Sequence, residues 1–158
     1  MIFKFNDGTT MPIDSNMVKL SAFFDEQQKL GVKELSLSEA FIGEAFDGFC
    51  KKFFPDFEEK LSELEHTTDK EDWWMEMIAE NPELAEPVKG FYQDDLIRVG
   101  NAAAEYGYPG VIHACAWVMA SKTENMRLNE LREYLNEEYD FPDEIKAKIE
   151  NCPEYGEL

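Results

Sequence analysis

The stretch IFKFNDGTTMPI, residues 2–13, decides the fold class, because it predicts a β-hairpin at the start of a chain that is otherwise patterned for helices. Residues 2–6 alternate apolar and polar side chains, as a half-buried strand does. Asp7-Gly8 is typical of a tight hairpin turn, after which Thr9 to Ile13 can return as a second strand. A third short strand is predicted at Lys33 to Leu37. We therefore expect an α+β fold with a small sheet.

Helices are predicted on either side of the third strand. Asp14 or Ser15 can cap a helix that ends near Gly31 and carries Val18, Leu20, Phe23 and Phe24. Ser36 and Glu39 have the spacing of a capping box, which would start the next helix. That helix has the strongest apolar stripe of the chain and should end before Pro55. Its apolar residues are Phe41, Ile42, Ala45, Phe46, Phe49 and Phe53.

Residues 55–90 are patterned less clearly. Phe57, Leu61 and Leu64 are compatible with a short helix, and His66 to Asp72 is polar enough to be a loop. Trp73 and Trp74 then open an apolar patch that Pro82 and Pro87 interrupt, and its elements stay undefined.

Two central helices follow. Leu96, Val99, Ala103 and Tyr106 share one helical face before Gly107, and Pro109 suits the first turn of the next helix. The apolar residues of that next helix are Val111, Ile112, Cys115, Val118 and Met119.

The stretch RLNELREYLNEEYDFPDEIKAKIEN, residues 127–151, predicts two short amphipathic helices joined at Asp140-Phe141-Pro142. Their apolar edges contain Leu131, Leu135, Ile145 and Ile149. Short isolated helices are marginal in water, so these edges need a surface to pack against. We expect a core over residues 1–122 and a two-helix extension over 123–158.

Composition and charge exclude several classes of protein. The 158 residues are 44% hydrophobic and 13% aromatic, which argues against a disordered chain. The formal net charge of -19 opposes binding to nucleic acid or to anionic membranes. There is no apolar run of membrane length and no signal-peptide pattern. Three widely spaced cysteines, Cys50, Cys115 and Cys152, fit reduced thiols, so we expect a cytoplasmic and nuclear location.

Catalytic and metal-binding patterns are not found in the sequence. His66 and His113 are far apart, and His113 and Cys115 fall on different helix faces, which makes a zinc site improbable. Gly107-Tyr108-Pro109-Gly110 is expected to be a helix–helix turn rather than a phosphate-binding loop. Acidic pairs follow from having 34 acids in the chain. We therefore expect no enzyme activity, no metal and no cofactor.

Four segments, in order along the chain, resemble the S-phase kinase-associated protein 1 family, the adaptors of SCF-type ubiquitin ligases. They are FKFNDGTTMPIDSNMVKLSAFF, LSLSEAFIGEAFDGFC, LIRVGNAAAEYGYPGVIHACAWV and LNELREYLNEEYDFPDEIKAKIEN. The resemblance implies a BTB/POZ core, formed by the N-terminal hairpin, a small sheet and packed helices, plus a C-terminal helical extension. Elongin C and ordinary BTB domains lack such an extension, so the last segment is the most specific.

The resemblance also implies partners: an F-box protein held by the extension, and the N-terminal part of a cullin. The implied F-box-binding residues are Leu96, Val99, Ala103, Val111, Cys115, Val118, Met119, Leu131, Leu135, Phe141, Ile145, Ile149 and Tyr155. Leu131, Leu135, Ile145 and Ile149 are the preferred contacts, while about half of the set is expected to form the core instead. An exposed apolar groove predicts a homodimer when the partner is absent.

The implied cullin-binding residues are Ala104, Glu105 and Tyr106. In the family an Asn-Tyr pair follows the paired alanines, and here Ala104-Glu105 stands in its place. The family's terminal Trp-Cys pair is also replaced, with Tyr155 displaced from the position of the Trp. Two hypotheses follow: an adaptor that bridges a cullin and an F-box protein, or a stand-alone F-box-binding protein or decoy that has lost the cullin.

Overall fold

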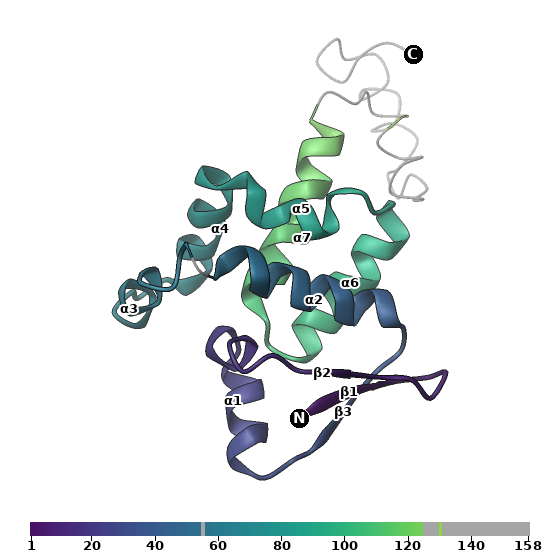
Figure 1. Cartoon of the computed structure of the whole chain (residues 1–158). Helices are drawn as coiled ribbons and strands as arrows, with labels where there is room; N and C mark the ends of the chain where they lie inside the picture. The colour runs from purple at the N-terminus through teal and green to yellow at the C-terminus, as the bar shows by residue number, and fades with distance from the viewer. Residues whose placement is uncertain (55, 125–129, 131–158) are drawn as a thin grey trace, which may run out of the picture. The chain divides into compact units, whose positions relative to one another are not determined.

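The computed structural model describes residues 1–54, 56–124 and 130, and within them the chain is α+β, with many helices and a three-stranded sheet (Figure 1). The chain divides into two compact units, Met1–Val118 and Met119–Leu158. The expected helices of residues 127–151 lie outside the described residues, apart from the exposed, helical Glu130.

The sheet has the order β2-β1-β3, from strands β1 (Ile2–Phe5), β2 (Thr10–Pro12) and β3 (Glu34–Leu37). β1 pairs antiparallel with β2, so that Lys4 faces Thr10, and parallel with β3, so that Lys4 faces Ser36. The hairpin prediction is confirmed. Gly8 adopts a φ of 86° in the turn, and the Asp7 carboxylate accepts hydrogen bonds from the Thr9 N–H at 2.9 Å and its hydroxyl at 2.6 Å.

A parallel pair needs a crossover connection. Here the crossover contains the 3-10 helix η1 (Met17–Leu20) and α1 (Ala22–Lys29). The expectation of one continuous helix is wrong, because Ser21 is extended between them with φ -141°. Its hydroxyl accepts a hydrogen bond from the Phe24 N–H at 3.2 Å and donates one to the Tyr106 carbonyl at 3.0 Å. The first hydrogen bond caps the start of α1, and the second connects this start to Tyr106, which is far along the sequence.

Helix α2 (Ala40–Phe53) packs between the sheet and later helices (Figure 1). The predicted capping box is wrong, because Ser36 belongs to β3 and pairs with Lys4. Glu39 occupies the N-cap of α2 without a side-chain cap bond. The predicted apolar stripe is confirmed for Ile42, Ala45, Phe46, Phe49 and Phe53, which are at most 2% exposed, whereas Phe41 is only half-buried.

The region that the sequence left undefined is mostly helical. It contains α3 (Lys60–Glu65), α4 (Lys70–Glu80), the 3-10 helix η2 (Pro82–Ala85) and α5 (Glu86–Lys89). The loop expected over residues 66–72 is shorter, because the Asp69 carboxylate accepts a hydrogen bond from the Asp72 N–H at 3.1 Å and caps α4. Trp74 then lies in the core, 1% exposed.

A short turn joins helices α6 (Gln93–Glu105) and α7 (Pro109–Thr123), as predicted. Gly107 provides the left-handed turn residue with φ 60°, and the Tyr108 N–H donates to the Ala103 carbonyl at 2.8 Å. None of the described helices is long and apolar enough to cross a membrane.

Candidate partner-binding surface

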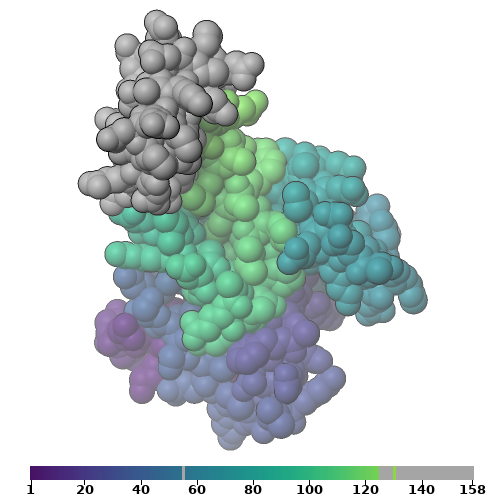
Figure 2. Space-filling model, turned by 180° about the vertical axis from the view of Figure 1, so that it is seen from behind, coloured from purple at the N-terminus to yellow at the C-terminus, as the bar shows by residue number. Residues whose placement is uncertain are grey.

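Helices α6 and α7, up to Val118, carry most of the described candidate residues, and they lie side by side on the face shown in Figure 2. A Cβ atom placed on Gly100 would meet the Cβ of Cys115 at 3.9 Å, an ordinary van der Waals distance, so the two helices are in close contact here. The two helices therefore form one packed unit.

Six of the implied F-box-binding residues belong to the core. Their side chains are at most 3% exposed, and they are Leu96, Val99, Ala103, Val111, Cys115 and Val118. Met119 is half-buried. A partner cannot touch fully buried side chains without displacing their neighbours, so these six can support a binding surface only through the packing of α6 and α7.

The remaining implied F-box contacts lie outside the described residues. They are Leu131, Leu135, Phe141, Ile145, Ile149 and Tyr155. Their role in binding stays a prediction.

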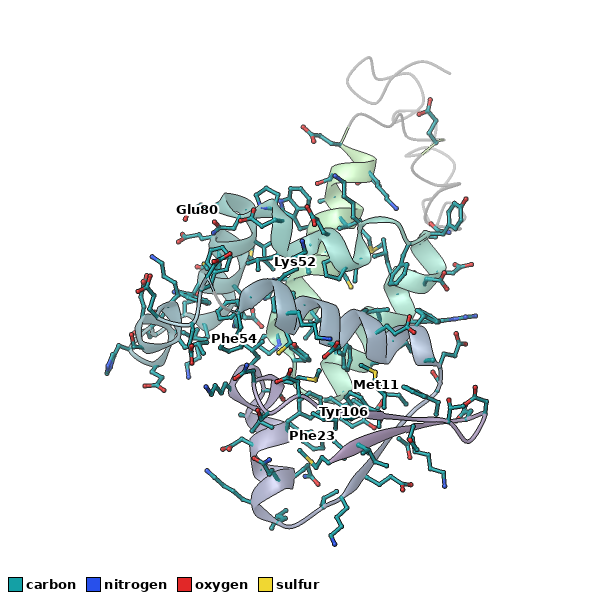
Figure 3. The ribbon with its side chains drawn as sticks, in the orientation of Figure 1. Met11, Phe23, Lys52, Phe54, Glu80 and Tyr106 are labelled. Carbon is teal, nitrogen blue, oxygen red and sulfur yellow. The ribbon has the colours of Figure 1, made fainter. Side chains whose placement is uncertain are left out.

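The implied cullin-binding residues separate into two environments. Ala104 and Glu105 are exposed at the C-terminal end of α6, whereas Tyr106 is only 9% exposed. Its ring lies 5.5 Å from that of Phe23 and 5.9 Å from that of Phe24 (Figure 3). Its hydroxyl donates a hydrogen bond to the Ser36 carbonyl. The structure therefore brings Ala104 and Glu105 to the surface and keeps Tyr106 as a packing residue.

Tyr106 also covers part of a sheet edge. In a parallel pair the backbone groups of alternate residues point away from the partner strand, and Ser36 is such a residue of β3. The Tyr106 hydroxyl satisfies its carbonyl. Burial raises the pKa of the Tyr106 phenol, and the Glu105 carboxylate adds to this, so the phenol keeps its proton at neutral pH. Tyr106 therefore links the turn after α6 to the sheet.

The sequence analysis did not predict an exposed stripe on α6. Ile97, Asn101 and Ala104 recur at i, i+4 and i+7, and all three are exposed, Ile97 at 41%. Tyr92, just before α6, is 82% exposed. The sequence contains a signal for the exposure of Ile97, because this residue directly follows Leu96 and so falls outside the helical stripe of Leu96, Val99 and Ala103. An apolar residue outside the buried face is a candidate contact.

A hollow of about 280 Å³ adjoins the C-terminal end of α6. Its lining includes Arg98, Asn101 and Glu105 of α6 together with Ser36 and Ile42. A guanidinium nitrogen of Arg98 pairs with the Glu39 carboxylate at 3.3 Å, which connects α6 to the start of α2. Glu105 therefore stands at the rim of a polar depression.

The titratable groups of this region do not form a reactive set. Burial raises the pKa of the Cys115 thiol to about 12, so it stays protonated and is a poor nucleophile. Burial lowers the pKa of His113, while the Glu71 carboxylate opposes that shift. Within residues 1–54 and 56–124, no cluster of three or more His, Cys, Asp or Glu side chains could hold a metal ion.

No protein-family model matches the chain, and no curated protein matches it.

Proposed function

We propose that the chain is a divergent member of the S-phase kinase-associated protein 1 family, a non-catalytic adaptor of an SCF-type ubiquitin ligase. In this role it bridges the N-terminal part of a cullin to F-box substrate receptors. Catalysis would belong to other subunits of the ligase.

The observation that carries the proposal is the order of the elements. The antiparallel hairpin, the crossover helix, the third strand and the strongly apolar helix α2 follow one another along the chain. The packed pair α6 and α7 comes later, and the 127–151 stretch follows it. Each element carries the segment that resembles the corresponding part of the family. This agreement supports a BTB/POZ core.

The F-box contact is proposed to rest on the extension, while α6 and α7 give the core its rigidity. The buried residues of these helices, such as Val99 and Val111, would hold the pair rigid. Leu131, Leu135, Ile145 and Ile149 would supply direct apolar contacts, as an amphipathic helix does in a groove.

A stand-alone F-box-binding protein is the second candidate. It is favoured by Ala104 and Glu105, which are exposed where the family has an Asn-Tyr pair. A small residue and an acid provide little contact area for an interface, whereas aromatic residues dominate interface energies. Tyr106 does not replace the missing aromatic contact, because its hydroxyl and ring are already engaged inside the chain.

The test measures binding of the purified chain to F-box peptides and, separately, to a cullin N-terminal domain. Leu131→Asp and Ile145→Asp should each abolish F-box binding while the fold is retained, as monitored by circular dichroism. Leu30→Asp is the matched control, because Leu30 is an apolar residue that is 69% exposed beyond the end of α1.

Binding to both partners supports the bridging adaptor, and binding to the F-box alone supports the second candidate. If the chain binds neither partner, and the two aspartate variants only lower its stability, both proposals are wrong.

A further inference from the structure

A second surface lies between α3 and α4, and no residue of α6 or α7 contributes to its lining. We define the α3–α4 groove by the residues that line one hollow of about 210 Å³: Phe57, Lys60, Glu63, Trp73, Glu76, Met77, Glu80 and Asn81. Pockets for small ligands usually measure about 300–1,000 Å³. The α3–α4 groove is smaller, so its size suits a single side chain of a partner better than a whole small molecule.

One face of α4 forms a wall of the groove. Trp73, Glu76, Met77 and Glu80 recur at i, i+3, i+4 and i+7, the spacing of neighbours on one side of a helix. Glu80 lies at the outer margin of α4 in Figure 3. Glu76 and Glu80 are exposed, while Trp73 is half-buried. The wall therefore combines an aromatic surface with two solvated carboxylates.

Trp73 is held in place by its neighbour. Its ring lies 4.9 Å from that of Trp74 in an edge-on arrangement at 89°, and Trp74 is itself 1% exposed. A ring packed against a core residue loses little freedom when a partner arrives, which lowers the entropic cost of binding.

Negative charge dominates this part of the chain. Between residues 56 and 80 there are ten acids and two lysines. Within the described part of the chain, Glu76 and Glu80 form no ion pair, whereas Glu63 has Lys60 at 3.8 Å. At the other end of α4, the Asp69 carboxylate is the main cause of a raised pKa at Asp72, with Glu71 adding to it. The like charges at the start of α4 are therefore close enough to disfavour one another's ionised forms.

The same chain contains an example of how such a site holds a cation. The ammonium nitrogen of Lys19 lies 5.6 Å from the centre of the Phe54 ring and 3.0 Å from the Glu58 carboxylate. An aromatic face and a carboxylate thus share one cation. Trp73 with Glu76 and Glu80 offers the same pair of groups, and no lysine or arginine of the described residues lies over the Trp73 ring.

We infer that the α3–α4 groove docks a basic segment of a partner protein, with an arginine or lysine side chain against Trp73 and an apolar side chain beside it. The cation gains attraction from the indole face and from Glu76 and Glu80. The apolar neighbour covers Phe57, which is half-buried in the same lining. The lining of the groove shares no residue with the proposed F-box and cullin contacts.

The test uses a labelled synthetic helix of about 14 residues, a length near the minimum for a stable isolated helix. Its leucines stand at i, i+3, i+4 and i+7 and its other positions are arginine, and a second peptide has glutamate in place of each arginine. Fluorescence anisotropy with the full chain should show binding of the arginine peptide alone. Affinity should fall as salt is raised, because exposed charges are screened.

Two paired variants separate a groove from a general effect of charge. Glu76→Lys with Glu80→Lys should weaken binding at least about tenfold. Glu26→Lys with Glu44→Lys changes the net charge equally at exposed positions of α1 and α2, and should change affinity less than about twofold. Trp73→Leu, which keeps an apolar side chain but removes the aromatic face, should also weaken binding several-fold.

Three results would overturn the inference: no binding of the arginine peptide at low salt, equal losses in the two charge-reversed variants, or unchanged affinity in Trp73→Leu. Binding of F-box peptides should be the same in Glu76→Lys/Glu80→Lys as in the unchanged chain. That readout keeps a failure of this inference distinct from a failure of the proposed function.

Discussion

At the scale of single residues, Gly110 shows how tightly the aromatic core is packed around the start of α7. A Cβ atom at this position would lie 2.5 Å from the Phe49 ring and 3.0 Å from the Trp74 ring. The Tyr108 ring adds to the constraint, because it packs edge-on against Phe49 at 5.8 Å. Rigid rings cannot move aside as the end of a flexible side chain can.

Gly110→Ala should therefore lower the free energy of unfolding by about 2–3 kcal/mol, the cost of overpacking a well-filled core. Urea denaturation followed by circular dichroism measures it. Gly90→Ala is the control: Gly90 has φ -84° and nothing within 4 Å of an added Cβ, so alanine should be neutral or slightly stabilising. Equal stability of the two variants would contradict this account of the core.

The two described cysteines make a second prediction at this scale. Burial raises the pKa of Cys115 to about 12, and burial together with the Asp14 and Asp47 carboxylates raises the pKa of Cys50 to about 12. Both thiols should resist iodoacetamide at pH 8 in the folded chain and react after unfolding, because only the thiolate is nucleophilic. Peptide mass spectrometry measures the labelling. Rapid modification of either residue in the native chain would show that the helices around it open readily.

At the scale of elements, the exposed end of α6 makes a prediction about the cullin contact. Replacing Ala104 by Asn and Glu105 by Tyr restores the pair found in the family, on side chains that already face solvent. The double variant should bind a cullin N-terminal domain at least about tenfold more tightly, since a central aromatic residue contributes about 2 kcal/mol to many interfaces. Calorimetry with the isolated domains measures the change.

The matched control is Tyr106→Phe, which removes the hydrogen bond to Ser36 but adds no surface contact. It should leave cullin affinity unchanged and lower the free energy of unfolding by about 1 kcal/mol. A loss of cullin affinity in Tyr106→Phe would show that this hydroxyl acts at the interface after all. An unchanged affinity in the double variant would remove the end of α6 from the proposed contact.

The same elements show which local patterns could be predicted from sequence and which could not. The hairpin follows from Asp7-Gly8, and the turn between α6 and α7 follows from Gly107 and Pro109, because these residues restrict their own backbone. The continuous helix through Ser21 and the capping box at Ser36 were wrong, although the strand predicted at Lys33 to Leu37 is confirmed as β3. Long-range partners decide the conformations of both serines. Ser21 bonds to the Tyr106 carbonyl, and Ser36 pairs with β1. A local cap signal does not contain that information.

Similar reasoning applies to the candidate surface. The buried stripe of α6 is visible as a helical period, but a stripe facing the core and a stripe facing a partner look the same in sequence. The structure buries Leu96, Val99 and Ala103 in the core. It leaves Ile97 and Ala104 exposed, so these two are the candidate contacts for a partner. The α3–α4 groove was hidden for another reason. Its lining comes from α3, α4 and the residues beside them, and no local sequence pattern predicts that these two helices lie next to each other.

At the scale of the whole molecule, two features bear on the proposed function: the α+β order of the elements and a net charge of -19. A net charge of this size repels other acidic surfaces and favours basic ones. A bridging adaptor needs two partner surfaces that work at the same time. Binding of each partner alone does not establish that.

The most direct measurement is therefore a bridging assay. An immobilised cullin N-terminal domain is incubated with a labelled F-box domain, with and without the chain. The account predicts that the label is retained only when the chain is present, and that Leu131→Asp abolishes retention while Leu30→Asp does not. If the label is never retained although the chain is folded, the bridging role is contradicted.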